Sequence, residues 1–307
     1  MISQEKVSQP MNIERIAIII PAYNVQKYIK ECINSVLAQT YQHFTIFVVD
    51  DGSTDTTPAI LSGYQKLDSR IKIFHKEHSG ASSARNFALS EIKRSKESFT
   101  YLFFLDSDDV IESTFFQKAV SALQQSKADL AVCSVKEFTK NSVRQQPKPH
   151  RQILTKDEFA QLHFGIGKLG GTSVSYCFLC NKFFRYSMVI GSLFNAKLRT
   201  AEDQEWILSN VMPAIRTAVI VPDAEYCYRL RNSSLCHFND NPQYFRVYSA
   251  LDWNSQKYTT SAASCIFNRL IDSMYFEIKQ SFISPKYYKA TDELLKQCRT
   301  MALKGVL

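Results

Sequence analysis

Residues 101–109 read YLFFLDSDD, and the fold prediction starts from this stretch. Residues 101–105 are all apolar, which is typical of a strand buried on both faces. The run ends in three carboxylates, Asp106, Asp108 and Asp109. Ligands of open α/β sheets bind at the C-terminal ends of strands, so these acids are expected to face a crevice. Because like charges repel, a divalent cation with oxygen ligands would suit them, but an acidic turn before a helix N-terminus explains the triplet equally well.

The chain before this stretch alternates apolar strands with helical segments. Strands are predicted at residues 15–21, 44–49 and 71–75, and helices at about 26–38, 55–68 and from 82 onward. This alternation predicts an α/β fold in which helices flank a mostly parallel central sheet. Polar residues follow three of the strands and should converge on one edge of the sheet: Tyr23, Asn24, Asp50, Asp51, Asp106 and Asp108.

The second half of the chain has a less regular pattern. Strands are expected at 129–135, 176–184, 217–221 and 225–230, and helices at 113–126, 155–164 and 200–211, the second opened by a capping box, Thr155-x-x-Glu158. We expect a polar tail (1–14), one main domain (15–235, with halves 15–125 and 126–235) and a helical C-terminal extension (236–307).

The net charge of +8 suits phosphorylated substrates, anionic lipid or nucleic acid. Basic residues lie in or beside the polar loop 139–152: Lys140, Arg144, Lys148, Arg151 and Lys156. A solvated loop is the favoured interpretation, with contact to phosphate or an anionic membrane as the alternative. The basic residues are not interleaved with aromatics, so nucleic acid is not expected. The polar start and the lack of an apolar run of ~18 residues predict a cytoplasmic protein, at most peripheral at the inner face of the membrane.

The eight cysteines lie mostly in apolar segments, which favours reduced core thiols over a disulfide framework. Cys177 and Cys180 form a C-x-x-C pair. No second pair has suitable spacing, so a structural zinc site is not expected.

Four motifs, in this order, resemble the nucleotide-binding half of glycosyltransferase family 2: IIIPAYN (18–24), FVVDDGSTD (47–55), GASSARN (80–86) and FLDSDD (104–109). The resemblance resumes over CNKFFR (180–185), AED (201–203) and YCYRLRNSS (226–234). It implies a GT-A fold and an inverting, hexosyl-type transfer from a nucleotide sugar, with UDP as the expected nucleotide. The acceptor implied is a hydroxyl of a surface-glycan or lipid-linked saccharide.

The resemblance also implies roles for particular residues. Asp203 would be the general base, and Asp106 and Asp108 would bind Mn²⁺ or Mg²⁺. The nucleotide sugar would contact Pro21, Ala22, Tyr23, Asn24, Asp50, Asp51, Arg85, Asp106, Ser107 and Asp108. Apart from the resemblance, Trp206 lies one helical turn after Asp203 and is expected to line the acceptor side, and His237 is a weaker candidate for the metal shell. The sequence lacks the Q-x-x-R-W motif of processive relatives and has Ala88 where glycine is common, which favours transfer of a single sugar.

Other interpretations stay open at this point. Thr200-x-x-Asp203 is itself a capping box, so Asp203 would then only begin a helix. Arg85 would pair with a surface acid, and Tyr23 would pack in the core. A phosphatase of the haloacid dehalogenase type also places D-x-D after a buried strand, but it needs a Gly-Thr-like turn where this chain has Asp109-Val110. A non-catalytic nucleotide-sugar-binding module is the remaining alternative. The oligomeric state, donor sugar and linkage are not encoded in these motifs.

Overall fold

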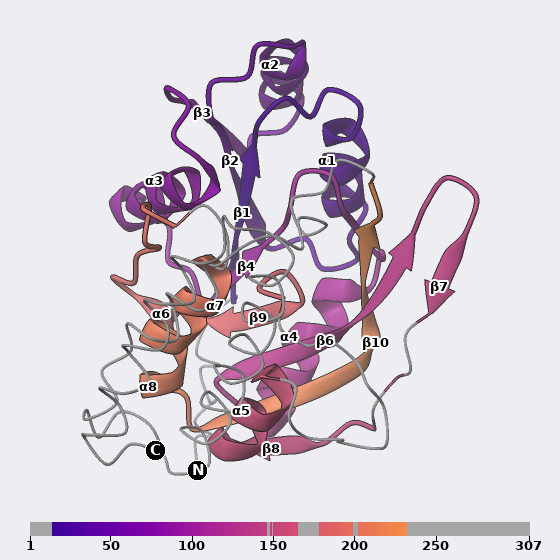
Figure 1. The fold of residues 1–307 in the computed structure, drawn as a ribbon, viewed down its shortest axis with the longest axis vertical. Coiled ribbons are helices and arrows are strands. Elements are labelled where there is room, and N and C mark those ends of the chain that lie inside the picture. The colour runs from indigo at the N-terminus through magenta and orange to yellow at the C-terminus, as the bar shows by residue number, and fades with distance from the viewer. Residues whose placement is uncertain (1–13, 146–147, 149, 165–177, 199–201, 232–307) are drawn as a thin grey trace, which may run out of the picture.

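The computed structural model describes residues 14–145, 148, 150–164, 178–198 and 202–231. Within these residues one ten-stranded sheet runs in the order β3-β2-β1-β4-β9-β6-β10-β5, with β7 on β6 and β8 on β10. Figure 1 shows this sheet at the centre of the molecule, with helices packed along it. The predicted α/β class is confirmed.

The first half of the sheet is parallel, as predicted. It contains β1 (Ile16–Ala22), β2 (Phe44–Asp50), β3 (Ile71–His75) and β4 (Tyr101–Phe104). β1 lies between β2 and β4, and β3 lies outside β2. Because these strands are parallel, the polar residues that follow β1, β2 and β4 lie at the same edge of the sheet.

The second half of the sheet is mixed. β9 (Lys182–Arg185) inserts antiparallel between β4 and β6 (Leu130–Phe138). β10 (Thr217–Arg229) runs parallel to β6 with a register shift between Val221 and Glu225. The two strands predicted at 217–221 and 225–230 are therefore one strand with a β-bulge, and β9 begins later than predicted.

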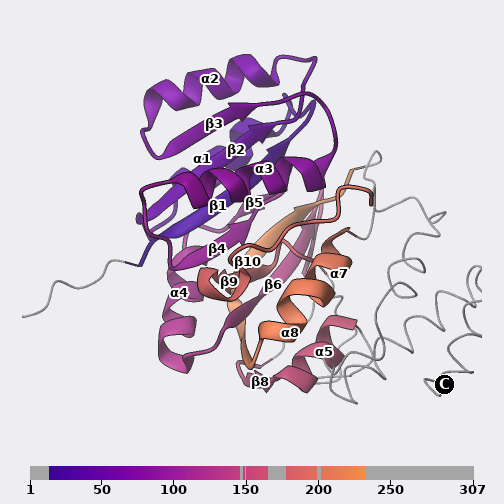
Figure 2. The ribbon, with the colours of Figure 1, turned by 90° about the vertical axis from the view of Figure 1, so that its left-hand side faces the viewer.

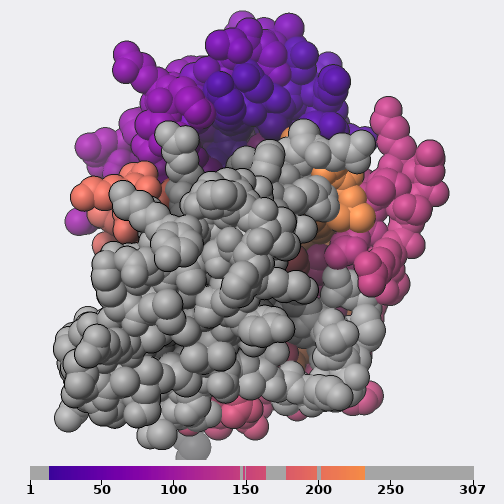
Figure 3. Space-filling model, viewed as in Figure 1, coloured from indigo at the N-terminus to yellow at the C-terminus, as the bar shows by residue number. Residues whose placement is uncertain are grey.

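Three short strands were not predicted from the sequence. They are β5 (Val110–Ile111), β7 (Val143–Gln145) and β8 (Ile153–Thr155), which pair antiparallel with β10, β6 and β10. β7 lies within the segment predicted to be a polar loop (139–152), and β8 begins directly after it. In the space-filling view the N-terminal residues, coloured indigo to purple, form one end of the described part, and the segment around β7 projects at the side (Figure 3).

Helices cover both faces of the sheet (Figure 2). Alternating residues of β1 point to opposite faces: Ile16 and Ile18 pack with α1 (Ile29–Leu37), α2 (Thr57–Leu67) and α4 (Phe115–Ser126). Ala17 and Ile19 pack on the other face with α3 (Ala81–Arg94) and α5 (Lys156–Phe164). Four short elements pack on the same face: α6 (Tyr186–Val189), α7 (Glu202–Trp206), a π-helical turn (Ile207–Val211) and α8 (Met212–Ala214).

Local helix signals are confirmed where their residues are described. Glu158 N donates to Thr155 Oγ1 (3.3 Å), and Thr155 N donates to Glu158 Oε2 (2.8 Å), which is the reciprocal capping box. Asp55 Oδ1 accepts from Thr57 N (2.8 Å) at the start of α2. Within the described part of the chain, no helix is both long and apolar enough to cross a bilayer. The segments before residue 14 and after residue 231, including the predicted extension, lie outside the described residues.

Candidate functional site

The three acids that follow β4 lie in one tight turn, residues 106–109, which we name the acid turn. Leu105 N donates to Ile19 O (3.0 Å), and Asp109 N donates to Asp106 O (3.0 Å), which closes the turn. The side chains of Asp106 and Asp108 are 36% and 16% exposed. Asp109 is buried. The turn therefore presents two accessible carboxylates and hides the third.

Asp109 anchors the acid turn to β10. Tyr226 Oη donates to Asp109 Oδ2 (2.6 Å), and Arg229 N donates to Asp109 Oδ1 (2.7 Å). Burial, and then the charges of Asp108 and Asp106, raise the pKa of Asp109 well above its ordinary value. Since each oxygen already has a protein donor, Asp109 acts as the structural member of the acid turn.

Asp108 is paired with an arginine that follows β10. Arg231 Nε lies 2.6 Å from Asp108 Oδ2, and Arg229 Nε donates to Asp108 O (2.7 Å). Burial and the charge of Asp106 raise the pKa of Asp108, while Arg231 lowers it. Arg231 thus supplies positive charge to the acid turn, and a cation bound at Asp108 would compete with it.

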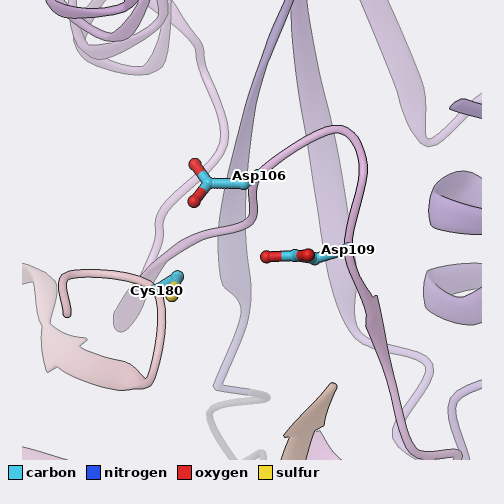
Figure 4. Close-up of side chains that lie close together, drawn as sticks. All are labelled: Asp106, Asp109 and Cys180. Atoms are coloured by element: carbon cyan, nitrogen blue, oxygen red, sulfur yellow. The ribbon is translucent and has the colours of Figure 1, made fainter. Parts of the chain in front are cut away.

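Asp106 and Asp108 offer carboxylate oxygens, the ligand type that a hard divalent cation prefers. A second grouping, Asp106, Asp109 and Cys180, brings its ligand atoms within 4.8 Å of one another (Figure 4). Burial raises the pKa of the Cys180 thiol well above its ordinary value, and a protonated thiol is a poor ligand. Mg²⁺ and Mn²⁺ prefer carboxylate oxygen. The two accessible carboxylates therefore match these ions better than the grouping that includes the thiol.

An exposed aromatic pair lies beyond the end of β1. Tyr23 stacks on His78 with ring centroids 4.0 Å apart and 20° between the planes, and Tyr23 is 43% exposed. Asn24 has φ 50° and is held by Thr54 N, which donates to Asn24 Oδ1 (2.8 Å). Because the Tyr23 side chain is this exposed, the interpretation of Tyr23 as a core residue was wrong, and its ring is available to stack on a planar ligand.

Asp51 organises the loop that carries His78. Ser79 N and Gly80 N donate to its carboxylate (3.1 and 2.7 Å), and Lys76 Nζ lies 2.5 Å from Oδ1. Gly52 follows with φ +74°, and a Cβ there would meet His78 N at 2.8 Å, so only glycine fits. The buried Asp51 carboxylate thus shapes the loop beside Tyr23.

The remaining residues predicted to bind the nucleotide sugar lie at the same sheet edge. Asp50 is buried, and its carboxylate accepts from Ser53 N (3.2 Å) and contacts His75 Nδ1 (3.1 Å). Ala22 and Ser107 are buried, and Pro21 lies next to Ala22 at the end of β1. The structure therefore brings all of the strand-end residues to one edge, although several of the acids already have protein partners.

Arg85, on the first turns of α3, joins the acid turn to α7. Its Nη2 donates to Asp106 Oδ1 (3.1 Å), and its Nη1 donates to Glu202 Oε1 (2.9 Å). The guanidinium is buried and lies 5.4 Å from the centroid of the Phe194 ring. Arg85 therefore does pair with acids, as the alternative interpretation held, but its guanidinium is buried and joins residues from both halves of the chain.

Asp203 lies in the first turn of α7, next to the Arg85 ion pair. Burial, and then the charge of Glu202, raise the pKa of Asp203 to about 7, opposed by Gln204 N, Arg85 and Lys182. A carboxylate that titrates near neutrality is suited to general-base chemistry. The expectation for Trp206 was wrong, since its indole is fully buried and stacks on Phe194 (5.0 Å, 8°) in the core.

Sequence reasoning missed several residues of the site. Tyr226, Arg229 and Arg231 belong to the motif YCYRLRNSS, which was quoted without a role for them, and His78 had no sequence signal. The basic stretch has acidic partners from other strands, which the local sequence does not reveal: Arg144 with Glu137 (3.7 Å), Lys148 with Glu225, and Arg151 with Asp223 (4.0 Å). Cys177, Thr200 and His237 lie outside the described residues.

Comparisons with known proteins agree on one family. Residues 17–191 match the model of the family described as Glycosyl transferase family 2. The uncharacterized glycosyltransferase EpsJ of Bacillus subtilis is 30% identical over 233 residues, which cover 74% of this chain and 64% of EpsJ. The match thus spans less than two thirds of that relative.

Solved structures share the fold. S. aureus TarS 1-349 in complex with UDP-GlcNAc superposes with a TM-score of 0.71 at 20% identity, over 92% of this chain and 81% of that chain. The mannosyltransferase PcManGT from Pyrobaculum calidifontis, in complex with GDP-Man and Mn²⁺, gives 0.53 at 15% identity, over 94% and 75%. At these identities the likeness concerns the fold alone.

Proposed function

The chain belongs to glycosyl transferase family 2, and on this premise we propose that it transfers a single hexosyl unit, with inversion, from a UDP-sugar to a saccharide hydroxyl. The acceptor proposed is a growing surface glycan or a lipid-linked saccharide. One observation carries this proposal: Arg85 joins Asp106 of the acid turn to Glu202, the neighbour of Asp203. The carboxylate of Asp106, on the donor side, and that of Asp203, whose pKa is about 7, are thereby fixed relative to one another.

The donor is proposed from the edge of the sheet. The exposed ring of Tyr23, backed by His78, offers a stacking surface for a base, and the loop held by Asp51 lies beside it. TarS was solved with UDP-GlcNAc and PcManGT with GDP-Man, and we propose UDP by analogy with TarS. Asp106 and Asp108 would hold Mn²⁺ or Mg²⁺, which offsets the charge of the departing diphosphate when bound.

Asp203 is proposed as the general base. Its carboxylate would take the proton from the acceptor hydroxyl while that oxygen attacks the anomeric carbon on the side opposite the leaving diphosphate. Arg85 would keep Asp106 oriented toward the donor through its 3.1 Å hydrogen bond. Membership of the family speaks against the phosphatase alternative, and the non-catalytic module is left to the test below.

The test begins with a screen of nucleotide sugars for thermal stabilisation in the presence of Mn²⁺, because a tight ligand raises the Tm by mass action. The donor found is then used to compare Asp203→Asn with the wild type. Asn keeps the shape of Asp but accepts no proton, so the rate should fall by roughly 10²–10⁴-fold while Tm and UDP affinity stay near the wild-type values.

Glu205→Gln is the matched control, since Glu205 lies on the same helix and bonds Ser209 Oγ (2.7 Å). It should keep its turnover. If Asp203→Asn keeps its turnover as well, the base lies elsewhere. If the protein binds a donor tightly but neither transfers its sugar to an acceptor nor hydrolyses the donor, it is a binding module.

Peripheral contact with the inner face of an anionic membrane is proposed on the net charge of +8. The ion pairs of Arg144, Lys148 and Arg151 with acids reduce the charge available from the basic stretch. Sedimentation with phosphatidylserine vesicles should therefore show weak binding at low salt that disappears as the screening length falls to about 8 Å. Equal recovery in the supernatant at every salt concentration would rule this contact out.

A further inference from the structure

Glu202 stands between two functional elements, and the function proposed above uses it only as the partner of Arg85, with no role of its own in the transfer. Its Oε1 accepts from Arg85 Nη1 (2.9 Å), and Arg85 Nη2 donates to Asp106 Oδ1 (3.1 Å). The side chain of Glu202 is 18% exposed and that of Arg85 is 8% exposed. Such sheltered, charge-assisted hydrogen bonds are geometrically specific, because the planar guanidinium fixes the positions of both acids.

Asp203 follows Glu202 directly in α7, so whatever fixes Glu202 also fixes the backbone of Asp203. Behind this turn, Trp206 packs against Phe194, and the same Phe194 ring lies 5.4 Å from the Arg85 guanidinium. The first turn of α7 is therefore held by an aromatic contact on one side and by an ion pair on the other. The ion pair is the contact that reaches a carboxylate of the acid turn, Asp106.

We propose that Glu202 is a positioning residue for sugar transfer, which through its ion pair with Arg85 holds the carboxylate of Asp203 in register with the acid turn. The inference rests on the proposed function, because it assigns Glu202 a role relative to Asp203 as the base. Glu202 is then not an alternative general base, since its Oε1 already accepts a hydrogen bond from Arg85.

The ion pair also sets the charge around Asp203. Among the described residues, the largest charge effects on Asp203 come from Glu202 on α7, Arg85 on α3 and Lys182 on β9. Glu202→Gln removes the one negative charge of this set and leaves Arg85 with fewer anionic partners. Both effects favour the ionised carboxylate, so the pKa of Asp203 should fall below its value of about 7.

The experiment measures kcat/KM against pH for Glu202→Gln and the wild type, with the donor identified by the thermal screen. The acid limb of the variant should move to lower pH. On the pH-independent plateau, kcat should fall about tenfold or more, because a misplacement of reacting groups by ~1 Å can cost ~10²-fold. The Kd for UDP should stay within a factor of about two, because Arg85 Nη2 keeps its hydrogen bond to Asp106 Oδ1 on the donor side.

A second measurement, of local structure, shows whether activity is lost only because the variant folds poorly. Amide hydrogen exchange at Gln204 and Trp206 should become faster in Glu202→Gln and stay at the wild-type rate in Glu205→Gln, the matched change on the same helix. Wild-type kcat, pH profile and exchange in Glu202→Gln would overturn the inference. Loss of the acid limb together with a rate as low as that of Asp203→Asn would also overturn it, because Glu202 would then be the base.

Failure of the inference is distinguishable from failure of the proposed function. If Asp203→Asn loses turnover and Glu202→Gln behaves as the wild type, only the inference fails. If Asp203→Asn keeps its turnover, the proposed base itself is wrong.

Discussion

At the scale of single residues, Asp203 links burial to catalysis. Its pKa of about 7 arises from burial and from the charge of Glu202, so near neutrality a substantial fraction of this carboxyl is protonated. A general base acts only in its ionised form. The ionised fraction rises as the pH increases through the pKa and is nearly complete about one unit above it.

The pH dependence of transfer follows from this titration. We expect kcat/KM to fall about tenfold per pH unit below about pH 7 and to level off above it. Initial rates with the donor found in the thermal screen, from about pH 5.5 to about 9, measure this acid limb of the profile. The residual activity of Asp203→Asn should lack it. A wild-type profile that is flat across this range would show that Asp203 does not limit the rate.

At the scale of elements, β10 holds the acid turn in place. Tyr226 Oη donates to Asp109 Oδ2 (2.6 Å) and accepts from Asp106 N (3.3 Å), so one hydroxyl joins both ends of the turn. Arg229 N satisfies the other oxygen of Asp109 (2.7 Å). The C-terminal end of this strand therefore determines where the accessible carboxylates point.

Tyr226→Phe tests this role of β10. The change leaves the buried Asp109 oxygen without its hydroxyl donor, so the free energy of unfolding should fall by about 1–3 kcal/mol in urea titrations. UDP affinity in the presence of Mn²⁺ should fall more than UDP affinity in EDTA, because the metal-binding acids lie in the disturbed turn.

Tyr64→Phe is the control, since its exposed hydroxyl bonds Asn34 Oδ1 (2.7 Å) and the change should cost under about 0.5 kcal/mol. Equal loss of UDP affinity with and without Mn²⁺ in Tyr226→Phe would contradict the assigned role.

The elements that the sequence predicted correctly are those with a strong local signal. β1, β2 and β4 are nearly continuous apolar runs that a parallel sheet buries on both faces, and the capping box of Thr155 and Glu158 lies within one helical turn. β5 has two residues, and β7 and β8 have three each, too few for any periodicity. Their pairing depends on β10 and β6, which a local pattern does not specify.

The same distinction holds for the site. The convergence of strand ends was predictable because parallel strands end at one edge. The partners of the acids were not, because Tyr226 lies 117 residues from Asp109 and Glu202 lies 117 residues from Arg85. Trp206 was misplaced for a related reason: helical spacing alone does not say which face of a short helix packs on the sheet.

At the scale of the whole molecule, the two halves of the chain share one sheet and two cores. β9 joins β4 to β6, and the packing on each face of the sheet includes side chains from both halves. Phe104 of β4, for example, lies 5.4 Å from Trp206 of α7. We therefore expect residues 15–125 and 126–231 to unfold as one cooperative unit, although they contribute different parts of the site.

Leu130→Ala in β6 tests this cooperativity. Leu130 is fully buried, so the change should lower global stability by about 2–5 kcal/mol. If the sheet opens as one unit, native-state hydrogen exchange should show the same loss of protection for Val48 in β2 as for Val132 in β6. Leu67→Ala at the end of α2, where the side chain is 81% exposed, should change neither amide. Unchanged protection at Val48 in Leu130→Ala would mean that the halves open independently, and Arg85 would then join two separately stable units.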